Sequence, residues 1–355
     1  MPTLSKSIIS LVVCATLLLT SDTSATHLTG SWTTLSPMST ARLSPFVAAV
    51  DGKLYVAGGN SGGPSPSSNV LERYDPLTDT WTTLAPLLTG RYQGGVAVLG
   101  TDIYVVGGWN PPSTFVPTNT VQIYDTLTNT WSFGPGMPIL SSSGPTGVID
   151  GKIYKHTAEH GFSSASRQLH VLDPNAGSWN ARANLPNDHA GGVPGVVGGK
   201  LYIASGTDFG FGSGGGPHAQ VHAYDPVSNT WSSLTTGPNP RQAVAGGQIG
   251  DHLLLAGGAN PSGTTLSLFE SYEVGSDTWS TLPSMPVAVN SAAGAVIGNK
   301  FYVVGGQSSG GVLQNSLYVF TIPEPSAAAL WMCGVAWLVM RRRHFRPDGI
   351  RLVCE

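Results

Sequence analysis

Short apolar stretches alternate with glycine- and proline-containing turns along most of this 355-residue chain. The first complete set consists of four segments, Phe46–Val50, Lys53–Gly59, Val70–Asp75 and Thr80–Leu84. Their residues are β-branched, aromatic or alternately apolar and polar, and Asp-Gly or Gly-Pro turn sequences lie between them. This pattern predicts a four-stranded antiparallel sheet.

The four-segment pattern repeats, and six tryptophans mark its period. They are spaced by 49, 50, 48, 52 and 48 residues: Trp32, Trp81, Trp131, Trp179, Trp231 and Trp279. A period near 50 indicates units that bury their apolar faces by stacking on their neighbours. It therefore predicts a single closed body over residues 26–321 rather than two domains.

Two further signatures recur at this period. The second segment of four units ends in a glycine pair: Gly58-Gly59, Gly107-Gly108, Gly257-Gly258 and Gly305-Gly306. The third segment of four units, three of which also carry the glycine pair, ends in a tyrosine and an acid: Tyr74-Asp75, Tyr124-Asp125, Tyr224-Asp225 and Tyr272-Glu273. Glycine tolerates positive φ and lets a neighbouring aromatic ring approach the backbone, while Trp and Tyr fill the wedge between sheets. We therefore expect these residues to be structural.

Together these residues resemble the kelch motif over residues 32–320. The resemblance implies a kelch β-propeller of the galactose oxidase type. Units three and four depart from the pattern, with His156-Thr157 and Ser205-Gly206 where glycine pairs are expected. Trp32 has no first three segments before it, and the last unit ends at Phe320 without a tryptophan segment. We therefore expect an all-β, six-bladed propeller of four-stranded antiparallel blades, in which Ser31–Leu35 completes the last blade and closes the ring.

Charge and cysteine content narrow the chemistry. The net charge of −3 and the lack of a basic stripe argue against nucleic-acid binding. Only Cys14, Cys333 and Cys354 are present, so residues 26–332 hold no internal disulfide and no thiolate chemistry. The cysteine-linked tyrosine cofactor of copper oxidases related to galactose oxidase is excluded for the same reason.

Both ends of the chain carry targeting patterns. Lys6, the apolar run Ile8–Leu19 and the small residues up to Ala25 fit a signal peptide over residues 1–25, with an uncleaved anchor as the alternative. The C-terminal pattern is Pro323-Glu324-Pro325, the apolar run 326–340, and Arg341-Arg342-Arg343.

Residues 322–343 resemble the PEP-CTERM sorting signal of Gram-negative bacteria. The resemblance implies processing by an exosortase-type enzyme and delivery to the cell surface or an extracellular polysaccharide matrix. The tail 344–355 departs from that pattern, because such proteins usually end soon after the basic cluster. A short transmembrane helix held by the three arginines on the cytoplasmic side is the alternative.

Candidate ligand-binding residues are expected where each blade begins, ten residues after each tryptophan. These positions hold Arg42, Arg91, Ser141, His189, Arg241 and Val289. Guanidinium groups around one mouth suit an anionic or polyhydroxylated ligand. Alternatively, the arginines cap strand ends and pair with loop carbonyls.

Aromatic residues in the loops after the second segments are the other candidates. They are Trp109, Phe115, Phe209, Phe211 and His218. Such rings stack on sugars or on partner side chains, although ordinary loop packing also explains them. His156–His160 matches the zinc-protease pattern H-x-x-E-H, but a strand would hold its two histidines roughly 13 Å apart. We expect no metal and no cofactor.

These observations favour an exported, surface- or matrix-associated, non-enzymatic binding module for a glycan, including an acidic sugar, or for a surface protein. The alternative is a sugar-active enzyme that resembles the sialic-acid mutarotases and epimerases, which are kelch propellers of this size. Residues 26–320 contain only four glutamates, and only Glu159, with Asp188 and His189, is expected near the mouth. Acid–base catalysis therefore has few candidate residues.

Overall fold

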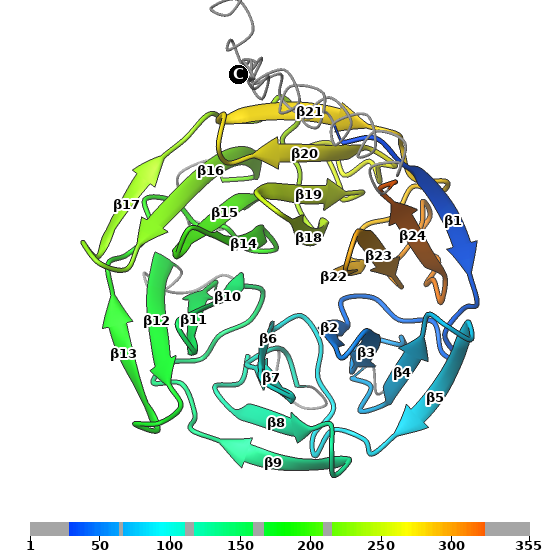
Figure 1. Cartoon of the computed structure of the whole chain (residues 1–355), viewed down its shortest axis with the longest axis horizontal. Helices are drawn as coiled ribbons and strands as arrows, with labels where there is room; N and C mark the ends of the chain where they lie inside the picture. The colour runs from blue at the N-terminus through cyan, green and yellow to red at the C-terminus, as the bar shows by residue number, and fades with distance from the viewer. Residues whose placement is uncertain (1–27, 64–66, 111–116, 159–166, 209–214, 324–355) are drawn as a thin grey trace, which may run out of the picture.

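The structure is a computed structural model that describes residues 28–63, 67–110, 117–158, 167–208 and 215–323. Within these ranges the chain forms six four-stranded antiparallel sheets and no helix. Figure 1 shows the sheets arranged as blades around a central axis, with the first strand of each blade innermost. The predicted all-β, six-bladed propeller is therefore confirmed.

The strands of blades 1 to 3 are β2 (Phe46–Val50), β3 (Lys53–Ala57), β4 (Leu71–Asp75), β5 (Thr80–Leu84), β6 (Gly95–Leu99), β7 (Asp102–Val106), β8 (Val121–Asp125), β9 (Thr130–Gly134), β10 (Thr146–Ile149), β11 (Lys152–Thr157), β12 (Gln168–Asp173) and β13 (Ser178–Arg182). Those of blades 4 to 6 are β14 (Val193–Val197), β15 (Lys200–Thr207), β16 (Pro217–Asp225), β17 (Thr230–Ser233), β18 (Ala245–Ile249), β19 (His252–Ala256), β20 (Phe269–Glu273), β21 (Thr278–Leu282), β22 (Ala293–Ile297), β23 (Lys300–Val304), β24 (Leu317–Thr321) and β1 (Ser31–Leu35).

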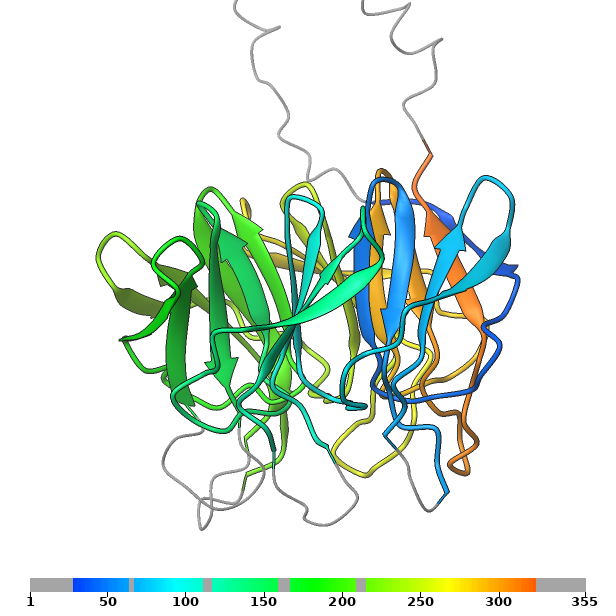
Figure 2. The same cartoon turned by 90° about the horizontal axis from the view of Figure 1, so that it is seen from below.

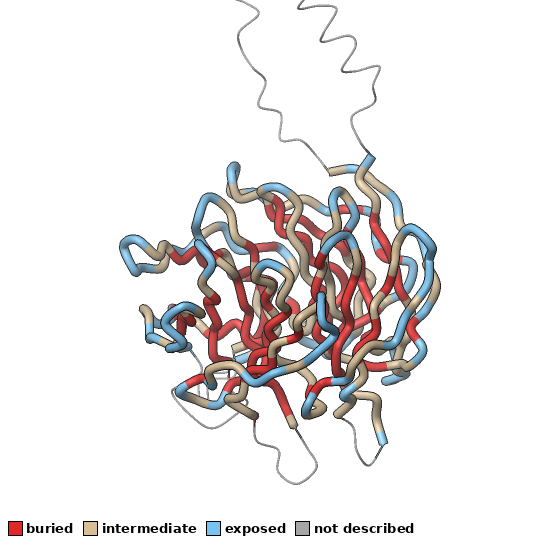
Figure 3. The backbone as a smooth tube through the Cα atoms, turned by 60° about the horizontal axis from the view of Figure 1, so that its bottom comes forward, coloured by how far each residue is buried: buried red, intermediate tan, exposed pale blue. Residues whose placement is uncertain are grey.

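The propeller has two different faces. The loops between second and third strands extend from one face, which we call the loop face, as Figure 2 shows for the segments around residues 60, 260 and 310. Connections that lead into the first strands lie on the same face, because Leu43 pairs with Asn60 and Gln242 with Ala259. Tight turns form the opposite face, and the described chain reaches its ends there (Figure 2). Buried residues follow the strands between these faces, and exposed residues concentrate in the turns (Figure 3).

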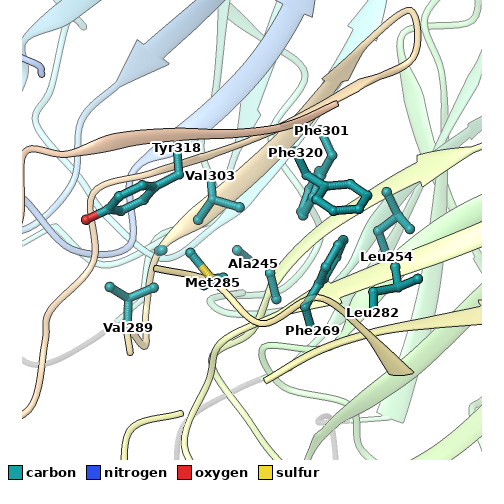
Figure 4. Close-up of a cluster of buried hydrophobic side chains, with 12 residues drawn as sticks. Ala245, Leu254, Phe269, Leu282, Met285, Val289, Phe301, Val303, Tyr318 and Phe320 are labelled. Carbon is teal, nitrogen blue, oxygen red and sulfur yellow. The ribbon is translucent and has the colours of Figure 1, made fainter. Parts of the chain in front are cut away.

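The ring closes as predicted, through β1. This strand pairs antiparallel with β24, from Ser31 opposite Thr321 to Leu35 opposite Leu317. The Trp32 ring lies 5.0 Å from that of Phe269 and 5.3 Å from that of Phe320. Figure 4 shows the cluster of blades 5 and 6 to which these phenylalanines belong. The N-terminal strand therefore joins two ends of the chain that lie almost 300 residues apart.

The repeated aromatic residues are structural, and the tryptophans also connect the blades. Each indole Nε1–H donates to a backbone carbonyl that follows the outer strand of the preceding blade; examples are Trp81 to Ser36 and Trp131 to Ala85, both at 2.8 Å. The repeat tyrosines are fully buried, and Tyr74 donates its hydroxyl proton to Asp79 at 2.7 Å. The six tryptophans are only partly buried, because their outer strands face solvent.

All eight glycines of the four pairs have positive φ, as the sequence predicted, but the close neighbour that excludes a side chain at Gly58 is not an aromatic ring. A Cβ on Gly58 would lie 2.3 Å from the carbonyl oxygen of Arg91, which belongs to the next blade. Gly59 then donates its N–H to that same oxygen at 2.9 Å. It is thus a neighbouring backbone carbonyl, rather than an aromatic ring, that requires glycine here. In blade 3 the strand register places Thr157 and Ala158 at the positions of the pair, one residue later than expected.

Within the described residues, no helix has the length and apolar character needed to span a bilayer. The predicted signal peptide and nearly all of the predicted sorting segment lie outside these residues. Both stay predictions.

Candidate binding site

A cavity of about 370 Å³ lies on the propeller axis and is lined by the start of the first strand of every blade. Its mouth is formed by the residue found twelve positions after each repeat tryptophan. These residues are Ser44, Gln93, Ser143, Gly191, Ala243 and Ser291. The spacing of the repeat therefore does locate the mouth, two residues beyond the positions that the sequence analysis selected.

Backbone hydrogen bonds connect these mouth residues from blade to blade. Ser44 donates its N–H to the Ser291 carbonyl at 2.6 Å, and Gln93 donates to the Ser44 carbonyl at 3.0 Å. Both donors have positive φ, 48° and 57°. A left-handed conformation costs a non-glycine residue of order 1–3 kcal/mol, so these hydrogen bonds offset a real strain. With the bonds from Gly191 to Ser143 and from Ser291 to Ala243, they link four of the six pairs of neighbouring blades at the mouth, whose side chains are small or neutral.

The wall of the cavity carries no ionisable side chain among the described residues. It consists of serine, threonine, glutamine, glycine, alanine, valine, proline and Phe46. Ser143 is 8% exposed, and its hydroxyl has no hydrogen-bond partner within the described part of the chain. The oxygen of this hydroxyl is itself buried, so the partly exposed side chains of Gln93 and Gln242 are the hydrogen-bonding groups that the wall offers. The wall therefore suits an uncharged ligand that can form hydrogen bonds.

The arginines predicted to line the mouth are buried beneath the loops. Arg42, Arg91 and Arg241 are each at most 1% exposed. Arg42 donates through Nη1 to the carbonyls of Gly58 and Val70, which flank the loop after β3, both at 3.1 Å. These contacts match the alternative interpretation, in which arginine pairs with loop carbonyls. Because their side chains point into the blade and away from the axis, the arginines form no part of the candidate site.

Two of these buried arginines form an ion pair with a glutamate near the start of the third strand of their blade. Arg42 pairs with Glu72 at 2.6 Å in blade 1, and Arg241 pairs with Glu270 at 2.7 Å in blade 5. Burial lowers the pKa of Arg241 to about 10, and the Glu270 charge opposes that shift. In blade 2 Arg91 has no carboxylate partner among these residues, and burial lowers its pKa to about 10.

Blade 4 replaces the Arg–Glu pair by two histidines. His189 Nε2 lies 2.7 Å from His222 Nδ1, and His189 Nδ1 lies 2.7 Å from the Ser205 carbonyl oxygen. Burial is the main cause that lowers the pKa of His222 to about 4, and it holds that of His189 well below its usual value. The pair is therefore neutral at neutral pH. His189, another predicted mouth residue, is fully buried as well.

Lys155 of β11 is a buried cation that the sequence analysis missed. Its Nζ donates to the carbonyls of Ser142, at 2.9 Å, and Gly144. Burial lowers its pKa to about 7. The equivalent residues of blades 1 and 2 are Val56 and Val105, so the only signal in the sequence was a lysine in an otherwise apolar strand position. Lys155 lies behind the cavity wall, since a Cβ on Gly95 would come within 3.0 Å of its Cδ.

The remaining predicted site residues that the structure describes do not line the cavity either. Val289 is 1% exposed, and His218 Nε2 lies 2.7 Å from the Asp188 carbonyl oxygen. Trp109 is 8% exposed, and its backbone pairs with Tyr92 and Pro117. Ser141 is fully buried, and its carbonyl accepts the Gly108 N–H at 2.8 Å. Phe115, Glu159, His160, Phe209 and Phe211 lie outside the described residues.

A closed ring of six four-stranded blades around a loop-lined axial cavity defines the class of six-bladed β-propellers. Within this class, the chain belongs to the kelch family. Residues 41–88, 90–138, 190–238 and 240–286, more than half of the chain, match the kelch motif.

Several curated proteins are similar to parts of the chain. Human Kelch-like protein 30 is 36% identical over 239 residues, which cover 66% of this chain and 38% of that protein. Human Kelch-like protein 21 is 30% identical over 125 residues, or 35% of this chain and 19% of that protein. Kelch-like protein terF of Aspergillus terreus is 27% identical over 153 residues, or 41% of this chain and 33% of that protein. The chain thus spans between a fifth and two fifths of these relatives.

The fold is also similar to a solved structure, that of YjhT. The TM-score is 0.68, and the match covers 82% of this chain and 97% of that one. At 18% sequence identity, this likeness concerns the fold alone.

Proposed function

We propose that this chain is a non-enzymatic binding module whose ligand site is the axial cavity together with the loop face around it. The observation that carries the proposal is the cavity wall, which has no acid, base or charged group among the described residues. General acid–base catalysis needs such a group within hydrogen-bond reach of the substrate. Hydrogen-bonding groups such as the side chains of Gln93 and Gln242 remain, and they suit recognition rather than catalysis.

The ligand that this wall favours is uncharged. An acidic sugar would find no cation on the wall, because the arginines are buried under the loops and Lys155 lies behind Gly95 and Gly144. A neutral glycan, or an uncharged segment of a surface protein, fits better. Membership of the kelch family supports a partner-binding role in general.

The position of the last described residues supports attachment to a surface through the C-terminal segment. The last described residue, Pro323, follows β24 on the tight-turn face, opposite the loop face. If the segment that follows holds the protein to a membrane or a matrix, the cavity mouth faces away from the attachment point. We therefore propose that an exported, surface- or matrix-associated propeller presents its loop face outward.

Binding of the full chain to an array of neutral and sialylated oligosaccharides tests the ligand class. The double variant Gln93→Glu/Gln242→Glu places negative charge on the neutral wall, and we expect it to weaken binding of neutral glycans at least about tenfold, or 1.4 kcal/mol. Leu127→Glu is the control, since Leu127 lies in a tight turn and is 77% exposed. Binding of sialylated glycans alone, or equal effects of both variants, would contradict the proposed site.

If no glycan binds, a protein partner can be sought at the same site. Residues 26–332 contain no cysteine, so once Cys14, Cys333 and Cys354 are changed to serine, Gln242→Cys provides a single thiol at the mouth for a photocrosslinker, and Leu127→Cys provides the control. A discrete crosslinked protein is expected from Gln242→Cys only.

The alternative, a sugar mutarotase or epimerase, has its own test. The rate of sialic-acid mutarotation with the full chain can be followed by NMR. A rate above the spontaneous one would overturn the non-enzymatic proposal.

A further inference from the structure

A second repeated pair of residues lies near the tight-turn face, where the second strand begins and the third ends. In blades 1, 3 and 4 this pair is a lysine and an aspartate. The three ion pairs have N–O distances of 2.5, 2.9 and 3.0 Å: Lys53–Asp75, Lys152–Asp173 and Lys200–Asp225. Each lysine neutralises the carboxylate and connects two neighbouring strands.

Blades 2 and 6 have other pairs at these positions, Asp102 opposite Asp125 and Lys300 opposite Thr321. Blade 5 differs from all five. His252 stands where the lysine is expected, opposite Glu273 in the strand register. The preceding residue is Asp251, where blades 1 and 3 have the glycines of their turns. Two carboxylates therefore face one imidazole, and the lysine that would compensate their charge is missing. One donor atom from each of the three side chains lies within 4.8 Å of the other two.

His252 itself lacks the contacts that a structural histidine usually makes. Its side chain is 9% exposed, and its Nδ1 is buried without a hydrogen-bond partner among the described residues. Nε2 lies 3.7 Å from Asp251 Oδ1, which is too long for a hydrogen bond. Nε2, the nitrogen that faces Asp251, thus also makes no hydrogen bond within the described part of the chain, and this is the atom that can take a metal ion beside the carboxylates.

The two carboxylates are held in place by their neighbours. Ser276 Oγ donates to Glu273 Oε2 at 2.9 Å, which orients the carboxylate. The Val274 N–H donates to the Asp251 carbonyl at 2.9 Å, which fixes the turn that carries this aspartate. Such second contacts are what position metal ligands in proteins.

We propose that Asp251, His252 and Glu273 bind one divalent transition-metal ion of the Zn²⁺ type. One imidazole and two carboxylates are ligands that Zn²⁺ accepts, with water at the fourth position. Metal–ligand bonds of about 2.0–2.2 Å require the donors to approach by roughly 1 Å from their present separation. The ion balances the two carboxylates and connects β19 to β20, as lysine connects the corresponding strands elsewhere.

Zinc titration of the metal-free full chain against a chelating dye tests the site. We expect the wild type to bind one equivalent of Zn²⁺. His252→Lys, which restores the lysine–acid pair of blades 1, 3 and 4, and Glu273→Gln should each lose this equivalent. Saturating Zn²⁺ should raise the Tm of the wild type but not that of either variant. Asp225→Asn is the matched control, because it removes the equivalent carboxylate of blade 4, which pairs with Lys200, and should retain the equivalent of Zn²⁺.

The same stoichiometry in the wild type and in His252→Lys would overturn the proposal. So would a wild type that takes up no Zn²⁺ at saturating concentration. Glu273→Gln tests the site even if His252→Lys disturbs folding. Glu273 is partly exposed at the end of β20, so its replacement by glutamine should leave the fold intact.

Discussion

Removal of the N-terminal strand gives the sharpest test of how this propeller is held closed. A chain that lacks residues 27–35 loses β1, and β24 then becomes an edge strand. Trp32 is lost with it, and this ring contacts Phe269 and Phe320 and donates its indole N–H to the Pro283 carbonyl at 2.8 Å. The deletion therefore removes the outer strand of blade 6 and the Trp32 ring that packs against both blades, while the direct contact of Phe320 with Phe269 remains.

The magnitude follows from these contacts. Truncation of a core tryptophan to alanine costs about 3–5 kcal/mol, and half-burial places Trp32 near 3 kcal/mol. Its indole hydrogen bond adds about 1 kcal/mol. The backbone bonds of β1 contribute about 0.5–1.5 kcal/mol each, and the entropy of ordering its residues largely offsets them. We expect a loss of about 4 kcal/mol, which lowers Tm by roughly 8 °C at about 2 °C per kcal/mol for a body of this size.

Far-UV circular dichroism during thermal and urea unfolding measures this loss without depending on tryptophan fluorescence. Addition of a synthetic peptide of residues 27–35 should recover part of the lost stability. Trp81→Ala serves as a control, because it removes the same side chain from a blade built from consecutive strands. A Tm within 2 °C of the wild type after the deletion would refute closure by β1 as a source of stability.

Three further predictions concern the interior. Arg42→Ala should cost about 3–5 kcal/mol in urea unfolding, because it leaves Glu72 buried without its partner, and Arg42→Ala/Glu72→Leu should recover much of that loss. Gly58→Ala should destabilise the chain much more than Gly52→Ala in the same assay, since both have positive φ but only Gly58 would place its Cβ 2.3 Å from a carbonyl oxygen. Burial lowers the pKa of His222 to about 4, below the value of about 6.5 expected in the unfolded chain. The contribution of neutral His222 to the free energy of unfolding is therefore fully present above about pH 6.5 and is lost as pH falls towards 4. His222→Gln should make stability decline less steeply with acidification over this range, and an unchanged slope would contradict the assigned burial effect.

The arginine prediction also changes how binding experiments are interpreted. A variant such as Arg42→Ala weakens the fold, because the guanidinium holds the carbonyls of the loop after β3. Loss of ligand binding in that variant would therefore report a disturbed loop rather than a lost ligand contact. Variants at the mouth, such as Gln242→Glu, avoid this ambiguity.

The sequence by itself determined the fold class, the number of blades and the way the ring closes. These features depend on residue type and spacing along the chain: tryptophans at a period near 50, glycine pairs, and a last unit that lacks its fourth strand. Each of them follows from local chain geometry and from the need of every sheet to bury both faces. Targeting by the two terminal segments stays a prediction from the same sequence.

Only the tertiary structure decided which side chains reach the axis. Positions ten and twelve residues after a tryptophan are neighbours in the sequence, yet Arg42 points beneath a loop while Ser44 forms the mouth. The difference arises from a left-handed backbone at Ser44, φ 48°, and from Glu72, which lies thirty residues away and binds the arginine. Spacing fixes where a residue lies along a strand, but partners brought together by the closed ring determine the direction of its side chain.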